Sequence, residues 1–473
     1  MDQRSKAPGP APDAAPQRAE LLGLAAKAMN AAWSSFDRAR PRESVLDEDL
    51  LGRLAGALPE DGGDPADAIE DAARVLDASI SPARPLNLAY VGSTGLATAT
   101  VGDALAATYD VNLAAHSAAA AILEAQTSRW TAEFIGHPRA CGGFTSGGQI
   151  SNLSAILAAR ERAMPGSRVS GVSAQAGALY CSGEAHQSII RAAEVAGLGS
   201  ESVRRLPIDS ERRLVPEALE RALEQDLAAG VNPVAVIATA GTTLTGAVDP
   251  IADLVAICER RSVWLHVDGA YGLPAAATPS AAPLFAGIDR VDSATLDAHK
   301  WLGVPKSCSV LLVQDEEVLQ AAFGHREKYL LHREDAPNPV DHTLEYSRPM
   351  RSLKLWLVFR VHGAAALRVW IQRGIDNARL FTSLIDADPA FQMLHRPMLS
   401  TVCFRHTPPG VADLDAHNLR LARAIQADGR VYLAPATIDD RACLRGCFVN
   451  FRTTPEDVRL AVAVARELGE LLA

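Results

Sequence analysis

The sequence is poor in the features by which proteins hold nucleic acids or anionic membrane surfaces. Aromatic residues make up only 5% of its 473 residues, which leaves few platforms on which bases could stack. No long cluster of lysine or arginine occurs, and the formal net charge at pH 7 is −10. A chain of this charge does not attract polyanions. We therefore expect neither a nucleic acid nor a membrane as partner.

The sequence also lacks the signals of metal binding, export and membrane insertion. Its seven cysteines are scattered without a CxxC pair, so we expect no metal site, no disulfide framework and a reducing compartment. No uninterrupted apolar run is long enough to span a bilayer. Residues 1–16 are rich in proline and alanine and have no apolar signal core. We predict a disordered tail there and a cytoplasmic protein.

The length and the hydrophobic periodicity divide the remaining chain into three parts. Residues 17–95 have helical spacing and are interpreted as an N-terminal helical arm that packs on a partner subunit. Residues 96–350 pass from alanine-rich helices to alternating helix and strand signals, which favours a large α/β domain with a mostly parallel central sheet. Residues 351–473 predict a linking helix over 352–370 and a small C-terminal α+β domain.

Short strand-like runs give the expected strands, and those over 234–239 and 263–267 are continuously apolar. They cover 177–181, 203–206, 234–239, 263–267, 293–296 and 309–313 in the large domain, and 400–404 and 447–451 in the C-terminal one. Residues 323–347 have no period and are rich in His, Asp, Pro and Asn. A loop of this length inside a compact chain is usually functional or mobile, so we predict a mobile loop there.

Lys300 is the first candidate for chemistry, because it follows an apolar run and comes directly after a histidine. A lysine in such a position is costly unless it is paired or chemically used. In its neutral form it is a nucleophilic amine, which forms imines with aldehydes. An ordinary surface lysine is the alternative.

A second candidate is the turn Phe144-Thr-Ser-Gly-Gly-Gln-Ile-Ser-Asn152, which opens into a predicted helix. The first amides of a helix have no partner within the helix, and they lie at the positive end of its dipole. Such turns hold phosphate, although many Ser-Gly-Gly turns merely begin a helix.

Three more polar residues follow predicted strands, where α/β sheets bind ligands. Asp268 can pair with a protonated ring nitrogen, His186 can stack on a planar ring, and Thr243 can bond a phenolic oxygen. Each also has a structural interpretation as a capping, helix-entry or turn residue. Together with Lys300 and the glycine turn, they offer a partner for each functional group of one cofactor, pyridoxal 5′-phosphate (PLP).

These motifs resemble, in order and spacing, the group II PLP-dependent amino acid decarboxylases, which include aromatic-L-amino-acid, glutamate and diaminobutyrate decarboxylases. The matching segments are Thr145-Ser-Gly-Gly, His186, Gly241-Thr-Thr, His266-Val-Asp-Gly-Ala-Tyr271 and Asp297-Ala-His-Lys300. The resemblance runs from about residue 86 to 457. It implies the aspartate aminotransferase-like fold of the fold-type I PLP enzymes.

The resemblance also implies roles. Lys300 would bind the cofactor covalently, Asp268 would pair with the pyridine nitrogen, and His186 would stack on the ring near the substrate carboxylate. Thr243 would lie near the phenolic oxygen and Ala270 beneath the ring. The phosphate would be held by Ser146, Gly147, Gly148 and His299, with Arg348 nearby. Tyr329, in the mobile catalytic loop, would donate a proton in the other subunit's active site, which implies a homodimer.

The expected activity is decarboxylation of an L-amino acid, a carbon–carbon lyase reaction. The apolar run Leu86–Val91 favours an aromatic or other apolar side chain, if the segment 85–100 lines the pocket. An aminotransferase, an aldehyde lyase, a decarboxylation-coupled oxidase and a catalytically inactive binding protein are the alternatives. This chain departs from the animal aromatic-amino-acid enzymes at Asp297-Ala298, where they carry Asn-Pro, and at Gly147-Gly148, where they carry Ala-Ser.

Overall fold

The structure is a computed structural model. It describes residues 15–36, 47–92, 95–114, 117–172, 177–325 and 338–473. Most of the tail predicted over 1–16 lies outside these ranges, as does Tyr329 in the predicted mobile loop. Helix α12 (Glu317–Phe323) ends where that loop begins, and a 3-10 turn (Pro339–His342) follows the undescribed part.

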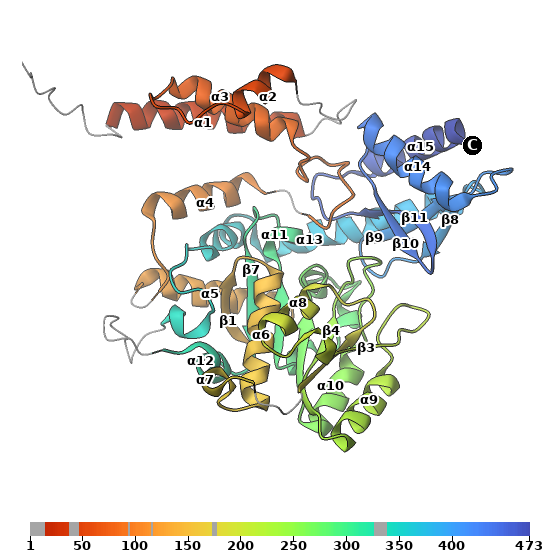
Figure 1. The fold of residues 1–473 in the computed structure, drawn as a ribbon. Helices are drawn as coiled ribbons and strands as arrows, with labels where there is room; N and C mark the ends of the chain where they lie inside the picture. The colour runs from red at the N-terminus through yellow and green to blue at the C-terminus, as the bar shows by residue number, and fades with distance from the viewer. Residues whose placement is uncertain (1–14, 37–46, 93–94, 115–116, 173–176, 326–337) are drawn as a thin grey trace, which may run out of the picture.

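The N-terminal part is helical, as the periodicity predicts. It consists of α1 (Ala15–Phe36), α2 (Glu48–Leu54) and α3 (Pro65–Ala78), which lie together at one end of the molecule (Figure 1). The start of α3 has a clear local cause: Asp64 accepts a hydrogen bond from the Ala66 amide, and Pro65 occupies the first turn. Next comes α4 (Ala97–Tyr109), which packs on the long helix α13 (Ser352–Asp386).

A seven-stranded sheet forms the centre of the chain. Its strands are β1 (Cys141–Thr145), β2 (Gly177–Ser182), β3 (Val203–Leu206), β4 (Asn232–Thr239), β5 (Trp264–Asp268), β6 (Ser293–Leu296) and β7 (Ser309–Val313), in the order β1-β7-β6-β5-β4-β2-β3. From β6 to β3 all pairs are parallel, and β7 is antiparallel to both of its neighbours. The expected mostly parallel sheet is confirmed.

Helices cover both faces of this sheet. They are α5 (Ala119–Phe134), α6 (Gly148–Ala163), α7 (Ser167–Ser170), α8 (Ser188–Val195), α9 (Pro216–Ala228) and α10 (Ile251–Arg261). In β4, Ala235 and Ile237 pack into one apolar cluster while Val236 and Ala238 pack into another. A strand buried on both faces reads as an unbroken apolar run, which is why 234–239 was recognisable.

The C-terminal part holds a second sheet, entirely antiparallel, in the order β10-β11-β9-β8. Its strands are β8 (Phe391–His395), β9 (Thr401–His406), β10 (Ala434–Ile438) and β11 (Arg441–Cys447), covered by α14 (Leu414–Asp428) and α15 (Pro455–Leu472). The helix predicted over 352–370 continues to Asp386, with a kink at Gly363, where φ is 77°. The strand predicted over 447–451 is wrong, because β11 ends at Cys447.

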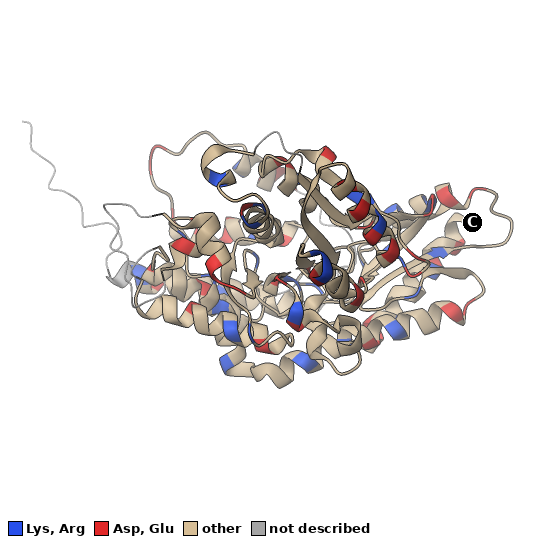
Figure 2. Cartoon of the chain, turned by 90° about the horizontal axis from the view of Figure 1, so that it is seen from below, with Lys and Arg blue, Asp and Glu red and all other residues tan. Residues whose placement is uncertain are grey.

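Charges of both signs are distributed over the visible helices, with lysine and arginine close to aspartate and glutamate (Figure 2). Among the helices that the structure describes, none combines the length and the apolar character that a membrane crossing needs.

Candidate active site

The carboxyl ends of the parallel strands open onto one cavity of about 270 Å³. The loops after β2, β4, β5 and β6 contribute to its wall, together with the first turn of α6. Strands that run in one direction end at one edge of their sheet, so residues far apart in sequence meet there. The lining residues are Gly148, Gln149, Asn152, His186, Ser188, Thr239, Gly241, Thr243, Asp268, Ala270, Tyr271, Asp297 and Lys300.

The glycine turn reaches this cavity as the sequence predicts. Ser146 and Gly147 connect β1 to α6, which begins at Gly148 and presents its free amides at that end. A side chain at Gly148 would place its Cβ 3.0 Å from Asp297 Oδ2 and 3.1 Å from Ala270 Cβ. A larger residue would therefore press on both neighbours at the cavity wall. His299 lies beside Gly147, with its Cε1 atom 3.8 Å from the Cβ position of that residue.

Asp268 ends β5 and is held from two sides. Asn152 Nδ2 donates to Asp268 Oδ2 at 2.8 Å, and the Ala270 amide donates to Asp268 Oδ1 at 3.2 Å. Asn152 lies on α6, one turn after Gly148, so the helix that offers its amides also orients the carboxylate. Asp268 is only 6% exposed, so these two hydrogen bonds fix the direction of its carboxylate.

Behind Asp268, the side chains of Asn152 and His266 form a hydrogen-bond network in which each donor has an acceptor. Asn152 Nδ2 also donates to Ser188 Oγ at 3.0 Å, so its Oδ1 must accept, and His266 Nε2 lies 3.1 Å from it. The proton of His266 is then on Nε2, and Nδ1 accepts from Ser293 Oγ at 2.8 Å. Burial lowers the pKa of His266 to about 4, which keeps the ring neutral, as this network requires.

Lys300 lies in α11 (Ala298–Trp301), one short turn after β6. Its Nζ is 3.1 Å from Asp297 Oδ2, and its side chain is 25% exposed, whereas that of Asp297 is 4% exposed. His299 Nδ1 lies 2.9 Å from the Cys308 carbonyl oxygen, and burial lowers the pKa of His299. A lysine, a buried carboxylate and a neutral imidazole therefore meet at the end of β6.

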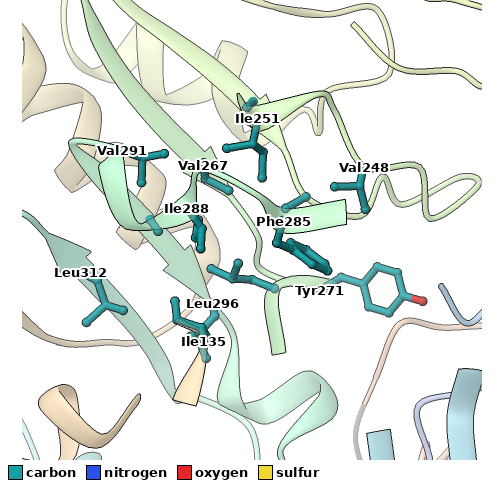
Figure 3. Close-up of a cluster of buried hydrophobic side chains, with 14 of the residues drawn as sticks. Ile135, Val248, Ile251, Val267, Tyr271, Phe285, Ile288, Val291, Leu296 and Leu312 are labelled. Atoms are coloured by element: carbon teal, nitrogen blue, oxygen red, sulfur yellow. The ribbon is translucent and has the colours of Figure 1, made fainter. Parts of the chain in front are cut away.

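The remaining predicted ring contacts lie around the same cavity. His186 follows β2, and its Nδ1 accepts from the Ser188 amide at 3.1 Å, which leaves the proton of the neutral ring on Nε2. Thr243 and Ala270 lie in the loops after β4 and β5. Tyr271 lies at the edge of the apolar cluster, with its hydroxyl turned away from it (Figure 3). That hydroxyl lies 2.5 Å from Ser400 Oγ, in the C-terminal part.

Arg348 is not among the residues that line this cavity. It is buried and forms a two-pronged ion pair with Glu124 of α5; one of the two contacts, Nη1 to Oε2, is 3.0 Å. The pair borders a separate small cavity of about 40 Å³, whose wall includes Thr145. Arg348 thus lies behind the strand that leads into the glycine turn.

The segment 85–100 also differs from the expectation that it lines the pocket. Leu86 and Leu88 belong to the apolar core of the C-terminal part. Tyr90 is half exposed and stacks on Tyr432, with ring centroids 6.2 Å apart. None of the described residues of this segment contributes to the cavity wall. The apolar run reflects packing in the core of the C-terminal part rather than the pocket's lining.

Two residues at the site, Asn152 and Asp297, had no role of their own in the sequence interpretation, and a third, Arg445, had one only as a candidate carboxylate-binding arginine of the aminotransferase alternative. Asn152 was part of the glycine motif, but nothing local showed that it contacts Asp268. Asp297 was visible only as a departure from Asn. Arg445 of β11 donates to the carbonyl oxygens of Thr243, at 2.6 Å, and of Ala89. Its signal was weak, because a lone arginine in a strand usually lies at the surface.

The residues around the cavity fit PLP. A glycine-walled helix N-terminus suits a phosphate, a carboxylate oriented by Asn152 suits a protonated ring nitrogen, and Lys300 suits an aldehyde. The fold and the site together define a fold-type I PLP enzyme. Residues 48–407 match the model of the pyridoxal-dependent decarboxylase conserved domain, and the chain belongs to this family.

Individual relatives agree with this placement. The chain is 31% identical over 445 residues to the aromatic-L-amino-acid decarboxylase of Bacillus atrophaeus, covering 92% of each sequence. It is 29% identical to the phenylacetaldehyde synthase of Arabidopsis thaliana, over 87% of this chain and 88% of the relative. The crystal structure of Catharanthus roseus tryptophan decarboxylase in complex with L-tryptophan superposes with a TM-score of 0.87. That match is 26% identical and covers 98% of this chain and 100% of the other.

Proposed function

We propose that this protein decarboxylates an L-amino acid with an aromatic side chain and releases the corresponding amine and carbon dioxide. The observation that carries the proposal is the meeting of Lys300, Asp268 and the start of α6 in one cavity. The resemblance to aromatic amino acid and tryptophan decarboxylases supports the choice of an aromatic substrate. The segment 85–100 does not support this choice, because none of its described residues lines the cavity.

When bound, PLP supplies an aldehyde that bonds to amines and a ring that accepts the electrons left behind as carbon dioxide departs. Asp268 has the task of keeping a proton on the ring nitrogen, and the amide of Asn152 keeps the Asp268 carboxylate in place. The amides at Gly147 and Gly148 hold the phosphate, with Ser146 and His299 beside them.

Other residues orient the substrate and move protons. His186 is proposed to stack on the ring and Thr243 to bond its phenolic oxygen; both residues line the cavity. Arg445 is 8% exposed and has no carboxylate partner among the described residues, so it is a candidate for holding the carboxylate of the substrate. Tyr329 is proposed to donate the proton that replaces the lost carboxylate.

The test is a borohydride trap followed by a product assay. The purified protein should show a yellow imine band that borohydride bleaches, and the label should map to Lys300. Lys300→Ala should abolish both; persistence of the band in this variant would refute the site. Carbon dioxide release is then screened over the common L-amino acids, with and without a keto acid. Release that requires no keto acid separates a decarboxylase from an aminotransferase.

The runner-up is a decarboxylation coupled to oxidation. One relative of this chain is named for an aldehyde product, and this observation favours the alternative. The two reactions differ in what appears beside carbon dioxide. A decarboxylase forms one amine per carbon dioxide and consumes no oxygen, whereas the coupled reaction forms an aldehyde and consumes oxygen. Measuring amine, aldehyde and oxygen in the same sample separates them.

We further propose a cytoplasmic homodimer in which Tyr329 serves the partner's active site. Exposed apolar side chains on α1, α4 and α5, namely Leu22, Tyr109 and Ile122, support an interface there. The seven cysteines are free, and six of them are buried, which suits a reducing compartment.

Mixing two inactive variants, Lys300→Ala and Tyr329→Phe, tests this arrangement. After the subunits exchange, mixed dimers have one complete site, so roughly one quarter of the wild-type activity should return. No recovery, with exchange verified by mass spectrometry, would place Tyr329 in its own subunit's site.

A further inference from the structure

Asp297 is the charged residue at the site to which neither the sequence pattern nor the family resemblance gives a task. It follows β6 directly, is 3% exposed, and contributes to the cavity wall. Its Oδ2 lies 3.1 Å from Lys300 Nζ and 3.7 Å from His299 Nε2. Its Oδ1 is buried and has no hydrogen-bond partner in the described part of the chain. A carboxylate so placed must offset its own desolvation by pairing with a cation.

The surroundings of Asp297 offer Lys300 as that cation. His299 is a poor one, because burial lowers its pKa and keeps the ring neutral. Lys306, in the loop after α11, is the other nearby ammonium, but it makes no direct contact with Asp297 among the described ion pairs. Burial, followed by the charge of Lys300, lowers the pKa of Lys306. Gly148 leaves no side chain between Asp297 and the amides of α6.

We propose that Asp297 is a positioning residue that holds the ammonium form of Lys300 whenever that lysine is not bonded to the cofactor. The inference rests on the proposed function. To bond to PLP, the Lys300 ammonium loses a proton, its nitrogen attacks the aldehyde carbon, a C=N bond forms and water leaves. When a substrate amine takes over that C=N bond, Lys300 is released and regains a proton, which the incoming substrate ammonium supplies. Asp297 stabilises the lysine at that moment and keeps it away from the reacting carbon.

This role has a measurable cost, because the amine must lose its proton before it can attack. A carboxylate 3.1 Å away favours the charged ammonium and slows the bonding to PLP at neutral pH. Asparagine has the same shape without the charge. In Asp297→Asn, the limiting rate of C=N formation at saturating PLP should rise about tenfold at pH 7, and this gain should shrink as the pH rises.

The experiment follows the imine band after apoprotein is mixed with PLP, between pH 6 and pH 9, in wild type and Asp297→Asn. The control is Asp103→Asn, which removes the other described lysine–aspartate ion pair, Lys354 Nζ to Asp103 Oδ2 at 2.9 Å, outside the cavity. That variant should follow the wild-type profile. A second arm uses pyridoxal, which lacks the phosphate. If the acceleration is present with PLP and absent with pyridoxal, Asp297 acts on the phosphate and the proposal fails.

A second measurement does not depend on the cofactor. Melting temperatures are compared for the apoprotein carrying Lys300→Ala, Asp297→Asn and both changes. Lys300→Ala alone leaves Asp297 buried without a cation, so adding Asp297→Asn should raise the melting temperature again, by on the order of 2 °C. Strictly additive effects, or overlapping pH profiles in the mixing experiment, would overturn the role of Asp297. Failure of borohydride to label Lys300 in wild type would instead refute the proposed function.

Discussion

The buried ion pair between Arg348 and Glu124 gives the strongest stability prediction. Both side chains are almost completely buried, with 2% and 5% exposure, and they share two contacts. Arg348→Met keeps the apolar stem but leaves the Glu124 carboxylate without its cation. Breaking a buried pair on one side costs about 3–5 kcal/mol, because the remaining charge is still desolvated. Adding Glu124→Gln removes that charge and should recover more than half of the loss.

Urea denaturation of the cofactor-free proteins, followed by tryptophan fluorescence, measures these differences as shifts of the midpoint. The control is Arg466→Met, because Arg466 pairs with Glu470 and Asp388 while 53% exposed, and its loss should change the midpoint little. If Arg348→Met shifts the midpoint no more than this control does, the pair does not stabilise the fold in the way described.

The same variants decide whether Arg348 also holds the phosphate, as the family resemblance implies. In the structure its guanidinium forms an ion pair with Glu124, and Arg348 is not among the residues that line the cavity. We therefore expect the double variant Glu124→Gln, Arg348→Met to recover most of the wild-type PLP affinity together with the stability. Recovered stability with PLP binding still weakened more than tenfold would return Arg348 to the phosphate site.

Three further predictions concern the network behind the cofactor. Asn152→Leu should lower PLP affinity in an absorbance titration and cost about 3 kcal/mol, because a charged acceptor and a buried ring N–H lose their partner; unchanged affinity would contradict this. Since the pKa of His266 is about 4, the unfolded chain gains a proton near pH 6.5 that the folded one refuses. Stability should therefore fall by about 3 kcal/mol from pH 6.5 to 4, a slope that His266→Gln loses. Gly148→Ala should weaken PLP binding in the same titration, because its Cβ would press on Asp297 and Ala270. Wild-type affinity would show that these two residues can move aside.

The central sheet was predictable where its strands are apolar on both faces. The exception is β1, Cys-Gly-Gly-Phe-Thr, whose glycines conceal it. It exists because it pairs with β7 along its whole length. The same limit applies to the C-terminal part, where β11 carries arginine and glycine and the more apolar run after it was chosen instead. Local propensity is a weak guide wherever pairing with a distant strand decides the outcome.

In the candidate site, too, residues with a local pattern could be predicted and residues that depend on distant contacts could not. Lys300, Asp268, His186 and Thr243 could be assigned together, because each lies at the end of a strand or within four residues of it, and the fold brings strand ends to one edge. The partner of Arg348 could not be found in this way, since Glu124 lies 224 residues away in the sequence. Nor could the packing of Leu86 and Leu88, which depends on a second sheet more than 300 residues further along. Distant contacts of this kind have no local pattern.

Arg445 has a consequence for how the wall of the cavity can vary. Its guanidinium connects β11 to the loop after β4 and to the segment before α4, through the backbone oxygens of Thr243 and Ala89. A link to the main chain does not depend on which side chain position 243 carries. Residue 243, which lines the cavity, can therefore be exchanged while the hydrogen bond to its backbone persists, whereas Ala89 is 1% exposed and lies outside the cavity wall. Diversity in the wall is best introduced at residue 243, with Arg445 left unchanged.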